Sequence, residues 1–179
     1  MYRCLIANRG EIAVRIIRAC RELNIETVAI YAKGDETSLH VSLADQAICI
    51  GEANPLDSYL NIDRIISAAK VTESNAIHPG YGFLSESTNF AKAVEDNHIH
   101  FIGPSKTTME MMGDKITARQ TVKQAGVPVI PGSNDAVQSV DEIKLLAKEI
   151  GFPVVLKAAS GGGGKGIRIV KEASQLDQA

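Results

Sequence analysis

Short apolar runs alternate with amphipathic segments over residues 3–103. Residues 4–7 form a continuous apolar run, typical of a buried strand, and residues 11–23 place apolar side chains at helical spacing. The same alternation predicts four more strands, at 26–31, 47–50, 75–78 and 100–102, and two more helices, at 62–69 and 89–95. Such an order predicts an α/β fold, a Rossmann-like parallel sheet with helices on both faces. Ligands of such sheets bind outside the carboxyl ends of the strands.

The chain after residue 103 has a different pattern. Residues 105–112 and 114–125 predict a helical connector, and residues 140–150 predict an amphipathic helix. Asp114 is suited to an N-cap, which places Lys115 in the first turn of its helix. A lysine there opposes the helix dipole, so its position indicates an anion nearby.

A glycine-rich loop follows between two short apolar strands. Residues 154–156 and 167–169 predict the strands, and five of the six residues from 161 to 166 are glycine. Glycine leaves the backbone N–H groups open to an anion, and Lys157 and Lys165 add positive charge. The pattern favours a polyphosphate ligand under a hairpin. A flexible surface hairpin or linker is the alternative.

Two common nucleotide motifs are absent. The loop ends in Gly166-Ile167-Arg168, where a Walker A motif requires Lys-Ser/Thr and then a helix. In the first strand–helix turn only Gly10 is present, because Ile12 and Arg15 occupy the other two glycine positions of the dinucleotide fingerprint. The sequence therefore favours neither a P-loop nor an NAD site.

Composition narrows the class further. The 179 residues are 45% hydrophobic with a net charge of −2, which supports a packed core and gives no basic surface for nucleic acid. No apolar run approaches the length of a membrane span, and no signal-peptide core is present, so we expect a cytoplasmic protein. Cys4, Cys20 and Cys49 have no zinc-ligand spacing, and we expect them to be reduced core residues. No carboxylate cluster supplies metal ligands by its spacing.

Two polar features have both a structural and a functional interpretation. On the first helix Glu11, Arg15, Arg18 and Glu22 form one stripe opposite the inner stripe of Ile12, Ile16, Cys20 and Leu23. The polar stripe is either a solvated face with an Arg18–Glu22 pair or a contact surface. The turn after the fourth strand, residues 78–86, is either purely structural, with His78 a core histidine, or the wall of a cleft.

Four motifs together resemble one family. They are residues 6–13 (IANRGEIA), 78–86 (HPGYGFLSE), 112–115 (MGDK) and 157–166 (KAASGGGGKG). In this order, they resemble the biotin carboxylases, in particular the biotin carboxylase subunit of bacterial acetyl-CoA carboxylase. The resemblance covers the whole chain.

The resemblance implies an ATP-grasp ligase that uses MgATP and bicarbonate to carboxylate biotin on a carrier protein. It implies a Rossmann-like domain over residues 1–103, a helical linker over 104–130 and the beginning of an ATP-grasp lid over 131–179. The implied partners are a second copy of the chain in a homodimer, the biotin carboxyl carrier protein and a carboxyltransferase.

Residue roles also follow from the resemblance. Lys115 and Lys157 are similar in position to lysines that contact the ATP phosphates, and Gly163 and Gly164 to lid glycines that close over them. Gly161, Gly162, Lys165 and Gly166 belong to the same loop. Tyr81 and Glu86 resemble cleft residues near biotin and bicarbonate. Arg15, Arg18 and Glu22 resemble residues of the family's dimer contact.

The family's catalytic residues and Mg²⁺ ligands are expected beyond residue 179. Residues 171–179 look like the start of a helix without a stop signal, so we expect the chain to be an N-terminal fragment that is inactive alone. Other interpretations stay open: the corresponding part of pyruvate or propionyl-CoA carboxylase, another ATP-grasp enzyme such as carbamoyl-phosphate synthetase, or a non-catalytic interaction module.

Overall fold

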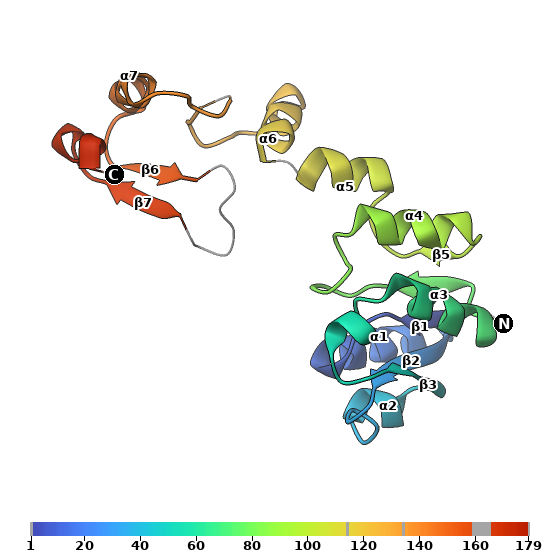
Figure 1. The fold of residues 1–179 in the computed structure, drawn as a ribbon. Helices are drawn as coiled ribbons and strands as arrows, with labels where there is room; N and C mark the ends of the chain where they lie inside the picture. The colour runs from blue at the N-terminus through green and yellow to red at the C-terminus, as the bar shows by residue number, and fades with distance from the viewer. Residues whose placement is uncertain (1, 114, 134, 159–165, 179) are drawn as a thin grey trace. The chain divides into compact units, whose positions relative to one another are not determined.

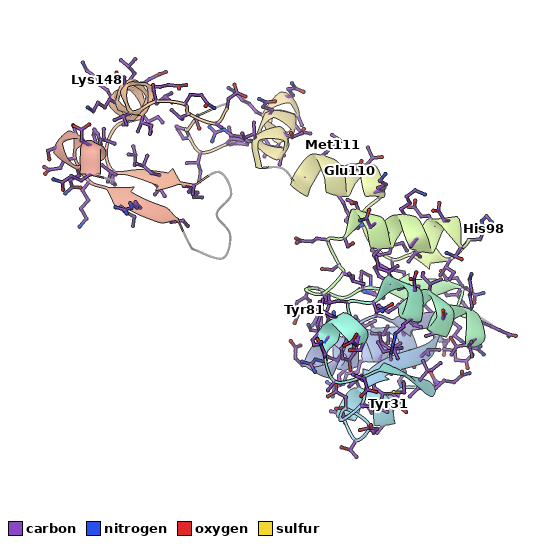
Figure 2. The ribbon with its side chains drawn as sticks, in the orientation of Figure 1. Tyr31, Tyr81, His98, Glu110, Met111 and Lys148 are labelled. Carbon is purple, nitrogen blue, oxygen red and sulfur yellow. The ribbon has the colours of Figure 1, made fainter. Side chains whose placement is uncertain are left out.

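The computed structural model describes residues 2–113, 115–133, 135–158 and 166–178, and of Lys115 the backbone only. The backbone divides into two compact units, Met1–Glu110 and Met111–Ala179. Glu110 and Met111, labelled in Figure 2, mark the division. Each unit is described by itself.

The first unit is built on five parallel strands in the order β3-β2-β1-β4-β5 (Figure 1). The strands are β1 (Arg3–Ile6), β2 (Glu26–Ala32), β3 (Gln46–Gly51), β4 (Ala76–His78) and β5 (His100–Phe101). The chain moves outward from β1 to β3 and then crosses to the other side of β1 to form β4. The strand order therefore reverses between β1 and β4, which is a topological switch point.

Helices cover both faces of this sheet. They are α1 (Gly10–Glu22), α2 (Leu39–Leu43), α3 (Ile62–Val71) and α4 (Thr88–Asp96), with a short 3₁₀ helix, η1, at Pro55–Asp57. Because successive strand residues point to opposite faces, Ile6 packs with Ile17 of α1 while Leu5 packs with Ile65 of α3 and Phe90 of α4. All five side chains are buried, so β1 is the centre of both cores.

Local sequence explains where these helices begin. Asn61 accepts a hydrogen bond from the Arg64 N–H at 3.1 Å and caps α3, and Ser87 accepts one from the Phe90 N–H at 3.2 Å and caps α4. Helix α1 has no such side-chain cap. It begins directly at Gly10, whose φ of 61° lies in the left-handed region that favours glycine.

The described part of the second unit consists of helices and a β-hairpin. The unit takes in the end of α5 (Lys106–Gly113), followed by α6 (Lys115–Gln124) and α7 (Val140–Ile150). The hairpin pairs β6 (Val154–Lys157) with β7 (Ile167–Val170) and is followed by the 3₁₀ helix η2 (Ala173–Gln178). Its buried apolar core consists of Ala147, Val154, Val170 and Leu176.

The α/β fold class predicted from the sequence is confirmed, and two details of the prediction are wrong. Cys49 is exposed rather than a core residue, because it lies on the edge strand β3. Leu23 leaves the inner stripe of α1 and is 69% exposed, because α1 ends at Glu22. The segment expected to begin a helix is helical over Ala173–Gln178, in the tighter 3₁₀ form of η2. Within the described ranges, none of the helices is long and apolar enough to cross a membrane.

Candidate functional site

The first candidate region is the switch point between β1 and β4. Asn8 follows β1, and the turn that contains Gly80 and Tyr81 follows β4, so both lie at the carboxyl edge of the sheet. The register of β1 and β4 pairs Ile6 with His78, which brings these two loops side by side. Open α/β sheets bind their ligands at this place.

Asn8 joins the two loops. Its side chain is fully buried, and Nδ2 donates to the carbonyl of Pro79 at 2.8 Å and to that of Tyr81 at 2.9 Å. Its Oδ1 accepts a hydrogen bond from the Arg9 N–H at 2.9 Å, so both ends of the amide are satisfied. From the sequence alone, Asn8 stands out only as part of the motif at residues 6–13. The missed signal is an amide side chain placed directly after a buried strand.

Position 80 requires glycine, because the backbone there lies close to the side chains of Asn8 and Ile12. Its φ is 66°, and a Cβ at this position would lie 2.6 Å from Cγ2 of Ile12 and 2.8 Å from Nδ2 of Asn8. The Gly80 N–H donates to Nδ1 of His78 at 3.0 Å. Burial lowers the pKa of His78, which favours the neutral ring that accepts this bond. His78 therefore holds the turn together, in line with its structural interpretation.

Tyr81 is the exposed member of this region (Figure 2). Its hydroxyl donates to Oε1 of Glu11, at the start of α1, at 2.6 Å. This hydrogen bond raises the pKa of Tyr81. Glu86 is also exposed, five residues later in the loop that leads to α4. The switch point thus presents a phenol that is oriented by a carboxylate.

The polar stripe of α1 starts at this same place. Arg15, Arg18 and Glu22 are all exposed, as the helical spacing predicts. No ion pair joins Arg18 to Glu22 in the part of the chain that the structure describes, so the pair proposed for a solvated face is not formed there. The exposed side chains of Arg15, Arg18 and Glu22 can therefore contact a partner.

The second candidate region is the hairpin β6–β7 of the second unit. Lys157 pairs with Ile167, and Val155 with Ile169, so these four side chains share one face of the hairpin. All four are exposed. The opposite face carries Val154, which packs towards α7 in the core. The hairpin therefore presents an apolar surface with one lysine at the end next to the glycine-rich loop.

Part of the predicted site lies outside the described residues. These residues are Gly161, Gly162, Gly163, Gly164 and Lys165, together with the expected N-cap Asp114 and the side chain of Lys115. The end of the loop is described: the Ala158 N–H donates to the carbonyl of Gly166 at 2.9 Å. Gly166 has a φ of 74°, and a Cβ there would lie 2.9 Å from that of Ala158. The pairing of the hairpin therefore continues by one hydrogen bond beyond β6 and β7, to Ala158 and Gly166.

A hollow of about 620 Å³ lies beside β6 in the second unit. Its lining combines the cations of Arg119 and Lys157 with apolar side chains that include Ile130, Val155 and Leu156. The Arg119 guanidinium donates to the carbonyl of Gly132 at 3.3 Å, which attaches α6 to the following turn. A mostly apolar wall with a few cations is suited to a ligand that has a flat ring and an anionic end.

The described residues contain no group of three or more His, Cys, Asp or Glu side chains that is arranged to hold a metal ion.

Two family models match successive parts of the chain. The family model of the biotin carboxylase N-terminal domain matches residues 1–109. The model of the carbamoyl-phosphate synthase L chain ATP-binding domain matches residues 114–179. Together they assign the first unit to one family domain and the hairpin unit to an ATP-binding domain.

Three relatives illustrate the range of similar proteins. Biotin carboxylase 1 of Bacillus subtilis is 56% identical over 174 residues, and pyruvate carboxylase of the same organism is 48% identical over 180 residues. The biotin carboxylase domain dimer of the 2-oxoglutarate carboxylase from Hydrogenobacter thermophilus is 52% identical, with a TM-score of 0.84. That structure contains MgADP, ADP and bicarbonate.

The coverage of these matches is uneven. They span 97%, 100% and 98% of this chain, but only 39%, 16% and 39% of the respective relatives. The chain therefore corresponds to well under half of each of them.

The fold and the matched ATP-binding domain define the class as ATP-grasp ligases. Within that class, the model that matches residues 1–109 covers more than half of the chain. The chain belongs to the biotin carboxylase family.

Proposed function

We propose that this chain supplies one side of the ATP site of a biotin carboxylase, which carboxylates biotin on a carrier protein at the expense of MgATP and bicarbonate. The observation that carries the proposal is the hairpin β6–β7, where an exposed lysine and an exposed apolar face lie next to a glycine-rich loop. The solved relative with bound MgADP and bicarbonate supports the same ligands.

Each part of the hairpin has a role in this proposal. The apolar face of Val155, Ile167 and Ile169 would contact the flat nucleotide base, while Lys157 would contact phosphate oxygens. Lys115 would approach the phosphates from the start of α6, where its charge is stabilised by a bound anion rather than by the helix dipole. Lysine and loop N–H groups would then stabilise the charge on the transferring phosphoryl group.

The glycine loop would act as the lid of this site. Gly163 and Gly164, with Gly161, Gly162, Lys165 and Gly166, would place backbone N–H groups on the phosphates and exclude water from the reaction. Mg²⁺ would neutralise phosphate charge when bound, with ligands from outside the described residues.

The switch point would receive the second pair of substrates. Tyr81 and Glu86 are exposed at the carboxyl edge of the sheet, where they would contact biotin and bicarbonate. The phenol of Tyr81 is held by Glu11 and is available to contact a ureido or carboxylate group.

The assembly and organisation of the protein belong to the same proposal. Arg15, Arg18 and Glu22 would form the contact of a homodimer, as the dimeric state of the Hydrogenobacter relative supports. We further propose that the domain boundaries lie at residues 103 and 130, as the sequence predicts. We also propose a cytoplasmic location, with a carrier protein and a carboxyltransferase as partners.

Acetyl-CoA carboxylase is the parent complex that we propose. Relatives named biotin carboxylase include the most similar of the three proteins above, whereas the pyruvate carboxylase is 48% identical. The test is to supply a polypeptide of full biotin carboxylase length, beginning with this chain, with carrier protein and carboxyltransferase. Carboxylation of acetyl-CoA supports this parent, and carboxylation of pyruvate or 2-oxoglutarate alone contradicts it.

The reaction itself is tested by biotin-dependent ATP cleavage in the presence of bicarbonate. We expect the full-length polypeptide to be active, Lys157→Ala to reduce its kcat/KM by at least about 100-fold, and the 179-residue chain alone to be inactive. Lys148→Ala, on the exposed face of α7, is the matched control and retains full activity. A Lys157→Ala enzyme with unchanged kinetics would refute the assignment of Lys157.

A further inference from the structure

The loop that carries Tyr81 contains a strained residue. Phe83 has a φ of 38°, in the left-handed region that bulky side chains rarely adopt. Such a conformation is unfavourable for the backbone and persists only where the surrounding contacts hold it. The contacts around Phe83 therefore indicate what sets the shape of this loop.

The ring of Tyr59 and the guanidinium of Arg9 hold Phe83. Its ring stacks on that of Tyr59, with a centroid distance of 5.2 Å and an interplanar angle of 11°. The guanidinium carbon of Arg9 lies 5.4 Å from the Tyr59 centroid and 5.9 Å from the Phe83 centroid. These distances are within the range of cation–π attraction, and Tyr59 is fully buried.

Asp35 fixes the other side of this group. Its Oδ2 accepts hydrogen bonds from the Tyr59 hydroxyl at 2.6 Å and from Nη1 of Arg9 at 3.3 Å. The Tyr59 hydroxyl also accepts a hydrogen bond from the Ala32 N–H at 3.0 Å. Burial raises the pKa of Asp35, but the bonds from Tyr59 and Arg9 outweigh burial and leave it below its usual value. The carboxylate thus stays charged and keeps Arg9 over the rings.

These residues come from the ends of separate elements. Arg9 follows β1, Asp35 follows β2, and Tyr59 follows η1, while Phe83 lies in the loop after β4. Asn8 holds the beginning of the same loop through the carbonyls of Pro79 and Tyr81. The loop is therefore held in two places. The Asn8 side chain binds the carbonyls of Pro79 and Tyr81, and Tyr59 and Arg9 pack on Phe83.

We propose that Arg9 and Tyr59 are positioning residues: they hold Phe83 in its strained conformation and thereby keep the Tyr81 hydroxyl on Glu11 at the switch point. The inference rests on the proposed function in one respect, namely that Tyr81 faces a substrate there. Neither Arg9 nor Tyr59 needs to touch that substrate. Their effect is transmitted through the backbone between Tyr81 and Phe83, two residues apart.

The test follows the Tyr81 hydroxyl itself in the 179-residue chain. The Glu11 hydrogen bond raises the pKa of Tyr81, and the nearby Arg15 has a smaller opposite effect. Tyrosine labelled with ¹³C at Cζ and titrated by NMR reports this pKa, with Tyr81→Phe to assign the signal. Hydrogen exchange of the amides of residues 80–86 reports the order of the loop.

Two variants break the stack in different ways. Arg9→Lys keeps the positive charge but loses the planar group that lies over the rings. Phe83→Leu removes the stacked ring and keeps an apolar side chain. We expect both to lower the pKa of Tyr81 towards its ordinary value of 10.0 and to speed exchange in the loop at least about tenfold. Glu11→Gln gives the pKa expected when the carboxylate is lost.

Val94→Ala is the control for a purely structural effect. Val94 is fully buried on α4 in the same core cluster as Tyr59, so its truncation lowers stability without removing a member of the stack. It should leave the pKa of Tyr81 unchanged. If Arg9→Lys and Phe83→Leu also leave that pKa and the exchange of the loop unchanged, the proposal is overturned. Neither nucleotide nor biotin enters these measurements, so this result is independent of the proposed function.

Discussion

At the scale of single residues, the switch point depends on a few buried contacts that admit no larger side chain. Asn8 bridges two backbone carbonyls, and Gly80 passes within van der Waals distance of it. Interiors packed at this density respond to the addition of one methyl group. Substitutions in this turn therefore test directly how closely Gly80 approaches Asn8.

Gly80→Ala and Gly82→Ala form a matched pair for this test. Both glycines have positive φ, at 66° and 73°, but a Cβ at Gly82 meets nothing within 4 Å. We expect Gly82→Ala to lower the free energy of unfolding by about 1 kcal/mol through backbone strain alone. Gly80→Ala adds a clash and should cost about 3 kcal/mol. Urea denaturation measures both, and equal losses would contradict the close approach.

His40 makes stability depend on pH. The side chain is 1% exposed, Nε2 lies 3.2 Å from the carbonyl of Ile30, and burial lowers its pKa below the ordinary 6.5. A lowered pKa means that the fold favours the neutral ring. The resulting stability is present above about pH 6.5 and is lost as the pH falls through the folded-state value.

We expect His40→Gln to flatten the fall in unfolding free energy between pH 7.5 and 5.5. His78, whose pKa is also lowered by burial, supplies the remaining slope. His100→Gln, at an exposed strand position, is the control and should keep the slope of the unsubstituted chain. Urea titrations at several pH values measure it. A His40→Gln slope that equals that of the control would contradict the role of His40.

The sequence predicts part of the candidate site and misses the rest for a physical reason. Lys157 and Gly166 are visible as a charge and a glycine beside a loop, which are local patterns. Asn8, Tyr59 and Asp35 act through contacts with residues 24 to 73 positions away. No local period reports such contacts, because they arise only when the strands are aligned in the sheet.

At the scale of elements, helix α1 connects two features of the first unit. It begins at the switch point with Glu11, which holds Tyr81, and its exposed stripe continues through Arg15, Arg18 and Glu22. The sequence predicted this helix to within one residue at each end, since its apolar period is regular over 13 residues. The five-residue helix α2 was missed because one turn carries too little periodicity to detect.

If the polar stripe of α1 forms the homodimer contact, reversing one of its charges should weaken the dimer. In the proposed homodimer, Arg18→Glu replaces a cation by an anion beside Glu22 and should weaken dimerisation at least about tenfold. Lys70→Glu makes the same charge change on an exposed position of α3 and should leave the dimer intact. Sedimentation equilibrium measures both. Equal dimer affinity in the two variants would contradict an interface at this stripe.

At the scale of the whole chain, the two units have cores of different size. The first unit has two clusters, one on each face of its sheet, whereas the described core of the second unit consists of four buried apolar side chains. Stabilisation by burial scales with the apolar area removed from water. The second unit should therefore open more readily than the first.

Hydrogen exchange tests this difference in the intact chain. We expect amides of β6 and β7 to exchange with a lower opening free energy than those of β1 and β2, by at least about 2 kcal/mol. The difference should persist when urea is added in steps, with the second unit unfolding first. Equal protection throughout the chain would show that the two units unfold as one.

The central claim is that the second unit forms one side of an ATP site, and calorimetric titration of MgATP into this chain tests it most directly. We expect the unsubstituted chain and the Lys148→Ala variant to bind MgATP with the same affinity. Lys148 lies on α7 (Figure 2). Lys157→Ala should bind at least about tenfold more weakly, because a direct phosphate contact is lost. Equal affinity in all three chains, or no binding to the unsubstituted chain, would contradict the claim.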